Sequence, residues 1–263
     1  MILVTGGSSG IGASVAVRLR DEGMSVWAAS RSGRIPAEGI HSVSMDVTSP
    51  GSVAAALDLI LGVEGRLDAL VVNAGNGITG AMEEYSPEEA SYQFETNFFG
   101  ALNTINASLP ALKRSGGRIV AVTSVAAIVP LPYQGLYSAS KAALQMAMKA
   151  YAIELKPFGI QCCCVLPGDT STGFTSARKT AGAASSPDSP YKERFDRCRA
   201  TFEKDETEGM PPSRIARAVC RQLRKPRMRI TVIPRLDYKA IALLVRLLPE
   251  RIVLWVLSRI YNK

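Results

Sequence analysis

The chain has 263 residues, of which 47% are hydrophobic and 21% are charged, and its formal net charge is +8. This composition excludes an intrinsically disordered chain and allows one α/β domain with a large packed core. The segment 221–263 holds 11 Lys/Arg and 2 Asp/Glu, a net charge of +9, which leaves −1 for the other 220 residues. Because the basic residues are concentrated at the C-terminal end, we expect no general nucleic-acid interface.

Short apolar runs alternate with longer helical segments along most of the chain. We expect strands at 2–4, 25–30, 40–45, 67–72, 118–124, 160–166 and 229–233. We expect helices at 11–22, 52–61, 138–155 and 87–112, the last one interrupted by Gly100 and Pro110. Strands that are almost wholly apolar and alternate with helices indicate a parallel sheet covered on both faces. The predicted fold class is α/β, a single Rossmann-type doubly wound parallel sheet of about seven strands with helices on both faces.

We assign residues 1–235 to one catalytic domain. Within it, residues 170–210 form the least regular stretch and follow the sixth predicted strand, where we expect a mobile cover over the substrate site. Residues 236–263 form an apolar, basic, helical extension whose uncharged runs are too short to span a bilayer. Two interpretations of this extension stay open: it packs over the substrate pocket or a dimer partner, or it lies in a membrane interface.

The cysteines indicate a reducing environment. Three of the five are consecutive, Cys162-Cys163-Cys164, inside an apolar run, and no metal-ligand spacing such as C-x-x-C occurs. Neighbouring residues on a strand point to opposite faces and cannot easily pair. We therefore expect buried thiols, no metal site and a cytoplasmic protein, with no signal peptide before the first apolar run.

A glycine-rich segment, Thr5-Gly6-Gly7-Ser8-Ser9-Gly10-Ile11-Gly12, joins the first predicted strand to the first predicted helix. Residues without a β-carbon let the backbone approach a pyrophosphate closely, and the helix N-terminus offers free N–H groups and a positive dipole end. The segment therefore predicts a dinucleotide site, with a purely structural turn as the alternative.

Tyr137 and Lys141 are four residues apart, so on a helix they face the same side. A free tyrosine has a pKa of about 10. We expect the ammonium of Lys141 to lower the pKa of Tyr137, so that this residue can act as general acid in reduction and general base in oxidation. Ser124 ends the fifth predicted strand, where its hydroxyl can hydrogen-bond a substrate oxygen. The alternative is a core tyrosine beside a surface lysine.

Together with Asp46-Val47, Asn73-Ala74-Gly75, Asn97 and Pro167-Gly168, these motifs resemble the classical short-chain dehydrogenase/reductase family up to about residue 172. The resemblance implies that Lys141 also holds the nicotinamide ribose and that Asn97 is a fourth catalytic residue, which positions a water. The implied cofactor-binding residues are Thr5, Gly6, Ser8, Ser9, Gly10, Ile11, Gly12, Arg31, Asp46, Val47, Asn73, Ala74, Gly75, Tyr137, Lys141, Pro167, Gly168, Thr170 and Thr172.

The end of the second predicted strand, Ala29-Ser30-Arg31, lacks the carboxylate that would accept hydrogen bonds from an NAD ribose. Arg31 can instead pair with a 2′-phosphate, and Arg34 could take its place. We therefore expect NADP(H) and not NAD(H).

The predicted activity is reduction of a ketone or aldehyde, or oxidation of a secondary alcohol, on an apolar substrate. The C-terminal extension is similar to the tails of family members that act on steroids, retinoids or other lipids. The alternatives are a 3-oxoacyl-carrier-protein reductase and a non-catalytic NADP(H)-binding protein. We also expect a homo-oligomer, with a dimer favoured, and peripheral membrane contact through 236–263 as one interpretation of the extension.

Overall fold

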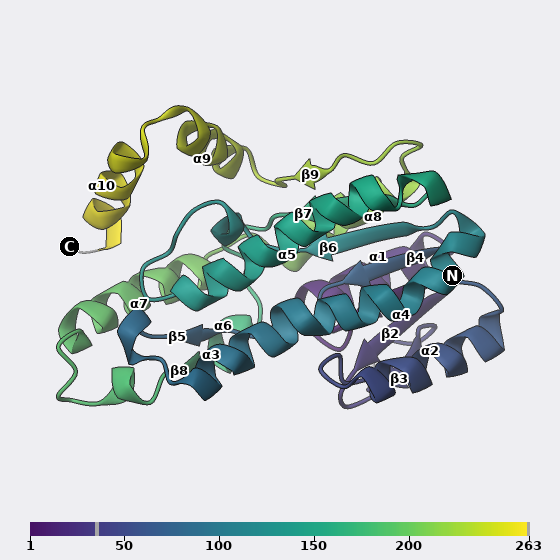
Figure 1. The fold of residues 1–263 in the computed structure, drawn as a ribbon, viewed down its shortest axis with the longest axis horizontal. Helices are drawn as coiled ribbons and strands as arrows, with labels where there is room; N and C mark the ends of the chain where they lie inside the picture. The colour runs from purple at the N-terminus through teal and green to yellow at the C-terminus, as the bar shows by residue number, and fades with distance from the viewer. Residues whose placement is uncertain (35–36, 262–263) are drawn as a thin grey trace.

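The computed structural model describes residues 1–34 and 37–261, and its centre is a seven-stranded parallel sheet (Figure 1). The strand order is β3-β2-β1-β4-β6-β7-β9. The strands are β1 Ile2–Thr5, β2 Val26–Ser30, β3 His41–Ser44, β4 Ala69–Val72, β6 Arg118–Val122, β7 Gln161–Val165 and β9 Thr231–Val232. This arrangement confirms the predicted doubly wound sheet, because the strand order reverses on either side of β1 and β4.

Helices cover both faces of the sheet. They are α1 Gly10–Asp21, α2 Pro50–Glu64, α3 Pro87–Phe94, α4 Gly100–Ser115, α5 Gly135–Glu154 and α8 Pro212–Arg224. On β7, Cys163 packs in the core under α1 and α8, whereas Cys162 and Cys164 pack in the core under α2, α4 and α5. Burial raises the pKa of each of these three thiols to about 12, as expected for cysteines that serve as small apolar residues.

The segment predicted as one long helix consists of three pieces. A π-helical turn, Glu95–Phe99, separates α3 from α4. Gly100 does not break the helix: a β-carbon there would lie 2.7 Å from Val47 Cγ2, so the glycine allows close packing. Pro110 also lies inside α4, which makes the predicted interruption at that residue wrong. Short 3₁₀ turns occupy Met82–Glu84, Val125–Ala127, Lys156–Phe158 and Ala183–Ser185.

Residues 170–210 are more regular than the sequence indicates. They contain α6 Phe174–Ala177, β8 Lys179–Thr180, which pairs with β5 Ile78–Thr79, and α7 Lys192–Thr207. Helix α7 buries Phe195, Cys198 and Phe202, which lie on one helical face. The stretch is therefore a folded layer, with its own small apolar core, over one end of the sheet.

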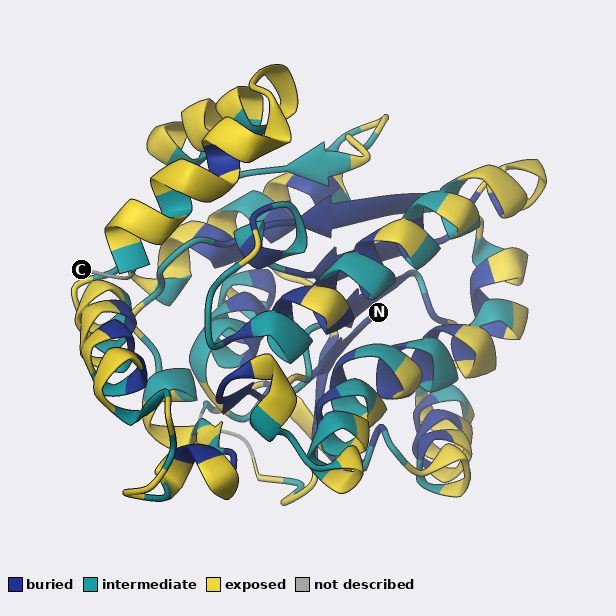
Figure 2. Cartoon of the chain, turned by 60° about the vertical axis from the view of Figure 1, so that its left-hand side comes forward, coloured by how far each residue is buried: buried dark blue, intermediate teal, exposed yellow. Residues whose placement is uncertain are grey.

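The C-terminal extension forms two helices, α9 Leu236–Leu247 and α10 Glu250–Tyr261, which lie beyond β9 at one end of the molecule (Figure 1). Pro249 lies between the two helices. The predicted extension ends at residue 263, and its residues 262 and 263 lie outside the described residues. Figure 2 shows that most of the surface of the two helices is exposed. None of the helices in the described part of the chain is long and apolar enough to cross a bilayer.

Candidate active site

The glycine-rich turn connects β1 to α1 through two glycines with left-handed backbone conformations, Gly6 at φ +64° and Gly10 at φ +55°. Gly12 is also required for space, since a β-carbon there would lie 2.2 Å from the Gly6 carbonyl oxygen. The Ser9 side chain makes no capping hydrogen bond at the start of α1, and Ser8 and Ile11 are partly exposed beside it. The turn therefore presents a helix N-terminus that the Ser9 side chain does not cap, and free N–H groups at such a terminus can bind a phosphate group.

Residues after β4 fasten this turn in place. The Thr5 hydroxyl accepts hydrogen bonds from the backbone N–H groups of Asn73 at 2.9 Å and Ala74 at 3.0 Å. The Asn73 side-chain amide donates to the carbonyl oxygens of Thr5 and Gly6 at 3.0 and 3.3 Å. The carboxyl ends of β1 and β4 are thus held together, and the backbone of the turn keeps its shape.

Arg31 and Asp46 lie at the carboxyl ends of β2 and β3. The Asp46 carboxylate accepts from the Thr48 backbone N–H at 2.9 Å and from its hydroxyl at 2.8 Å, which lowers the pKa of Asp46, and the charge of Arg31 lowers it further. Arg31 is exposed and therefore available to a ligand. Val47 is instead buried in the core, where it packs against Gly100.

Asn97 lies in the π-helical turn and is fully buried. Its side chain accepts from the Asn76 backbone N–H at 2.8 Å and donates to the Ser140 hydroxyl at 3.1 Å. Ser140 in turn donates to the carbonyl oxygen of Tyr137 at 2.8 Å. Asn97 therefore links the segment after β4 to the helix that carries Tyr137.

Lys141 is buried between the ends of β4 and β6. Its Nζ donates to the Val122 carbonyl oxygen at 3.2 Å, and a β-carbon on Gly75 would lie 3.4 Å from the same nitrogen and 3.2 Å from Asn97 Oδ1. Burial lowers the pKa of Lys141 to about 8. The structure thus brings Gly75, Asn97 and Lys141 together.

Tyr137 lies one helical turn before Lys141 on α5, with the Lys141 Nζ 5.8 Å from the centre of its ring. Desolvation raises the pKa of Tyr137, whereas its hydrogen bond with Ser124 acts in the opposite direction. The expectation that Lys141 lowers the pKa of Tyr137 is therefore corrected for this structure, because the cost of burying a phenolate outweighs its neighbours. Ser124 also accepts from the Ala126 backbone N–H at 3.1 Å, which fixes its side chain.

The segment after β7 closes the same edge of the sheet. The Pro167 carbonyl oxygen accepts from the Val125 N–H at 2.8 Å, and the Thr170 hydroxyl donates to the Gly168 carbonyl oxygen at 2.8 Å. Thr172 faces the glycine-rich turn, since a β-carbon on Gly10 would lie 3.5 Å from Thr172 Cβ. A phosphate held by the turn would therefore have the Thr172 side chain near it.

The sequence profile of the family described as short chain dehydrogenase matches residues 1–182. The chain belongs to the short-chain dehydrogenase family. It is 40% identical over 225 residues to the 3-ketodihydrosphingosine reductase of Bacteroides thetaiotaomicron, and the matched region covers 84% of this chain and 82% of that protein. It is 33% identical over 191 residues to 17-beta-hydroxysteroid dehydrogenase type 1 of Homo sapiens, and the matched region covers 66% of this chain and 58% of that relative.

Solved structures place this short-chain dehydrogenase in the same fold. A short-chain dehydrogenase from Streptomyces avermitilis has a TM-score of 0.84 and 27% identity, covering 98% of this chain and 96% of that one. A Burkholderia cenocepacia short chain dehydrogenase in complex with NADP has a TM-score of 0.75, 25% identity, and coverage of 95% and 94%. The 3-ketoacyl-(acyl-carrier-protein) reductase of Brucella melitensis with NADH has a TM-score of 0.74, 25% identity, and coverage of 88% and 95%. Structural neighbours therefore bind NADP in one case and NADH in another.

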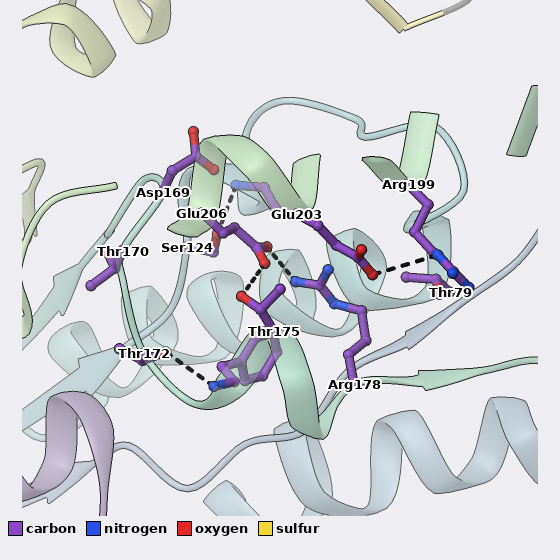
Figure 3. A network of polar contacts seen from close by, with 12 residues as sticks. Thr79, Ser124, Asp169, Thr170, Thr172, Thr175, Arg178, Arg199, Glu203 and Glu206 are labelled. Carbon is purple, nitrogen blue, oxygen red and sulfur yellow. Dashed lines mark hydrogen bonds and ion pairs between the residues drawn. The ribbon is translucent and has the colours of Figure 1, made fainter. Parts of the chain in front are cut away.

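The segment between β7 and α8 of this short-chain dehydrogenase adds side chains that sequence reasoning missed. Phe174 lies against Tyr137, with ring centres 5.7 Å apart. Arg178 forms an ion pair with Glu206, to which Thr175 also donates, and Figure 3 shows both side chains pointing toward that carboxylate. The Arg178 side chain is only 4% exposed, and its Nε and Nη1 atoms have no partner among the described residues. A salt bridge thus fastens α6 to α7 next to the tyrosine.

Two other residues at the site were also missed, Asn76 and Ser140, which hold Asn97. Asn76 directly follows the motif Asn73-Ala74-Gly75, and Ser140 precedes Lys141, so their positions beside recognised motifs were the available signal.

Proposed function

We propose that this short-chain dehydrogenase is an NADPH-dependent reductase of a ketone or aldehyde on an apolar, lipid-like substrate, with oxidation of the alcohol as the reverse reaction. One observation carries the proposal. Tyr137, hydrogen-bonded to Ser124 and one helical turn from Lys141, lies at the edge of the sheet where the glycine-rich turn and Thr172 face each other. A proton donor and a phosphate cradle at one edge support hydride transfer to a carbonyl.

The residues present fit a dinucleotide. Gly10 leaves space that a side chain would fill, and the N-terminus of α1 can receive a pyrophosphate. Arg31 is exposed beside Asp46, where a 2′-phosphate would gain a cationic partner. Gly75 leaves room beside Lys141, which could then hold ribose hydroxyls. These features favour NADP(H) over NAD(H).

The bound cofactor would supply a hydride to the carbonyl carbon. In our proposal the Tyr137 hydroxyl gives its proton to the carbonyl oxygen as negative charge develops there, and the Ser124 hydroxyl holds that oxygen in place. The phenolate left behind is stabilised by the ammonium of Lys141, which Asn97 helps to position through Ser140 and α5. In the oxidative direction Tyr137 accepts the alcohol proton instead.

The proposed substrate class rests on the relatives. The names of the Bacteroides and human relatives specify 3-ketodihydrosphingosine and a 17-beta-hydroxysteroid. The first match covers 84% of this chain and 82% of that protein, so it extends beyond the cofactor half of the fold. We therefore favour a ketone on a long hydrocarbon chain over a steroid.

The test is NADPH oxidation with a panel of ketones in detergent micelles: 3-ketodihydrosphingosine, a 17-keto steroid, a carrier-linked 3-oxoacyl thioester and a small ketone. We expect turnover that is fastest with the long-chain ketone. Tyr137→Phe should reduce kcat by roughly 10²- to 10⁴-fold, because it removes only the acidic proton. It should leave NADPH binding, followed by cofactor fluorescence, within about twofold of wild type. Activity retained by this variant would contradict the assigned acid.

The alternatives have distinct outcomes in the same assay. A 3-oxoacyl-carrier-protein reductase would prefer the carrier-linked thioester, an alternative supported by the Brucella melitensis structural neighbour and by the basic C-terminal segment. A non-catalytic NADP(H)-binding protein would bind NADPH and oxidise it with none of the ketones. We also propose a cytoplasmic homodimer, which sedimentation analysis would test.

A further inference from the structure

A groove lined by basic side chains runs between α8, β9 and the start of α9. It encloses about 390 Å³. Among the described residues no aspartate or glutamate lines it, and its basic residues are Arg214, Arg217, Arg221, Lys225, Arg229 and Lys239. The groove is lined by none of the described residues assigned to the candidate active site, and the proposed oxidoreductase activity does not use it.

The helical repeat of α8 explains the row of charges. Arg214, Arg217 and Arg221 recur at intervals of three and four residues, so they share one face of the helix, and Lys225 continues the row just after it. The opposite face is buried through Ile215, Ala216, Val219 and Cys220.

None of the six basic side chains forms an ion pair with a carboxylate within residues 1–34 and 37–261. Like charges held together without counterions repel one another, so the groove favours an anionic ligand.

The helices that follow the groove expose apolar side chains. Of the twenty large apolar residues that are exposed in the described chain, eleven lie in α9, α10 and the residue after α9. They are Leu236, Ile241, Leu243, Leu244, Leu247, Leu248, Ile252, Leu254, Trp255, Val256 and Ile260. Such a concentration marks an interaction surface.

Helix α10 has the features of an interfacial helix. Val253 is buried, Leu257 and Tyr261 are partly buried, and this face of α10 contacts α7. Trp255 is 59% exposed and lies one turn from both Arg251 and Arg259, and the Arg259 guanidinium stacks over its ring at 5.4 Å. An exposed tryptophan flanked by arginines is typical of a segment at the boundary between lipid headgroups and acyl chains.

We propose that the α8–β9–α9 groove binds the phosphate headgroups of an anionic phospholipid bilayer while α9 and α10 insert apolar side chains into the same interface. Lys239 connects the two parts, because it lines the groove and belongs to the first turn of α9. The unpaired arginines gain phosphate partners, and the exposed leucines leave water.

Other occupants fit less well. A second copy docked through the same groove would bring six cations against six, since a two-fold interface is formed by identical surfaces. A soluble acidic protein would satisfy the charges but would leave the eleven apolar side chains without a matching surface. A bilayer offers both an anionic layer and an apolar layer.

Flotation of the full-length protein with lipid vesicles tests this proposal. The vesicles are phosphatidylcholine alone and an equimolar mixture of phosphatidylcholine and phosphatidylglycerol. We expect binding to the anionic vesicles that is at least ~10-fold stronger than binding to the neutral ones and that weakens as salt is added. Arg217→Glu/Arg221→Glu should reduce binding to anionic vesicles by ~10-fold or more.

Two further variants complete the design. Arg114→Glu/Lys156→Glu makes the same change in net charge, from +8 to +4, at exposed residues near the ends of α4 and α5, and it should keep wild-type binding. Leu243→Ser/Leu247→Ser should weaken binding to both kinds of vesicle, because these side chains are 57% and 69% exposed. All substituted residues are exposed, so each variant is expected to fold.

Several outcomes would overturn the proposal. Equal losses in the two charge variants would mean that net charge alone drives binding, and unchanged binding of Arg217→Glu/Arg221→Glu would exclude the groove. Failure to bind anionic vesicles, with capture instead by a purified acidic acyl carrier protein, would reassign the groove to a protein partner. None of these measurements involves turnover, so this inference and the proposed function can fail separately.

Discussion

The hydroxyl of Tyr238 donates a hydrogen bond to the Asp169 carboxylate and accepts one from the Asp169 backbone N–H at 3.1 Å. Its ring lies on Gly168, where a β-carbon would come within 2.1 Å of the ring carbon Cε2. One residue of α9 is therefore fastened to the segment that follows β7 and leads to Thr170 and Thr172.

Tyr238→Phe should lower the free energy of unfolding by about 1–2 kcal/mol, because Asp169 is partly buried and would lose two hydrogen bonds. The effect should be measured by urea unfolding, with the NADPH Kd as a second readout. Gly168→Ala should have the larger effect on both, since the new methyl group displaces the ring. If Tyr238→Phe changed neither quantity, the contact between α9 and the segment after β7 would contribute neither to stability nor to NADPH binding.

Replacing Lys141 should stabilise the protein while it removes activity. Burial lowers the pKa of Lys141 from 10.5 to about 8, so the folded state disfavours the charged lysine. The unfolded chain therefore binds more protons between pH 8 and 10.5, and wild-type stability rises with pH across that window. Lys141→Met should be more stable by up to ~3 kcal/mol below pH 8, and this advantage should disappear toward pH 10.5.

Urea unfolding of both proteins at several pH values measures this difference. A variant that is less stable at neutral pH would show that the hydrogen bond to the Val122 carbonyl oxygen outweighs the cost of burying the charge.

Arg31→Asp should change cofactor preference. Loss of the guanidinium removes a charge-assisted contact with a 2′-phosphate, and the new carboxylate repels that phosphate while it accepts hydrogen bonds from an NAD ribose. We expect the ratio of kcat/KM for NADPH to that for NADH to fall by roughly 10- to 100-fold. Arg34→Asp is the matched control, because Arg34 is also exposed and follows β2 by a few residues. A larger shift in the control would assign the phosphate contact to Arg34.

Replacing only one partner of the ion pair between Arg178 and Glu206 should lower the free energy of unfolding. Glu206→Gln leaves a buried guanidinium without a carboxylate and should destabilise the protein by about 3 kcal/mol. Arg178→Met/Glu206→Gln should recover much of that loss, since the methionine can pack between the rings of Phe174 and Phe202. Thermal unfolding of the single and double variants completes the cycle, and purely additive losses would mean that the pair is not coupled.

The sheet could be predicted from the sequence because strands covered on both faces consist almost wholly of apolar residues, a pattern that is visible without tertiary information. Gly75 and Asn97 were assigned to the site through the family resemblance and Lys141 through its spacing from Tyr137, and in the structure these three residues lie together. The predicted direction of the pKa shift of Tyr137 was wrong: burial raises that pKa, and desolvation depends on packing that spacing does not describe.

Three other features could not be predicted from the local sequence. Helix α7 is dominated by charge and buries only three residues in a narrow stripe, so its periodicity is weak. Pro110 is accommodated inside α4, against the usual rule that a proline interrupts a helix. The contact between Tyr238 and Asp169 joins residues far apart in sequence, and no local pattern reports it.

Labelling of the three consecutive cysteines of β7 with a thiol reagent can report local unfolding of this protein. Their thiols face both cores and are poorly ionised at neutral pH, so a thiol reagent can reach them only when helices or strands separate. The rate of labelling under native conditions would then follow the population of opened molecules. In a background that carries Cys198→Ser and Cys220→Ser, Cys163→Ser would leave thiols only in the core under α2, α4 and α5, and Cys162→Ser/Cys164→Ser would leave one only in the core under α1 and α8. Comparing the two variants would separate exposure of one core from exposure of the other, without any added reporter group.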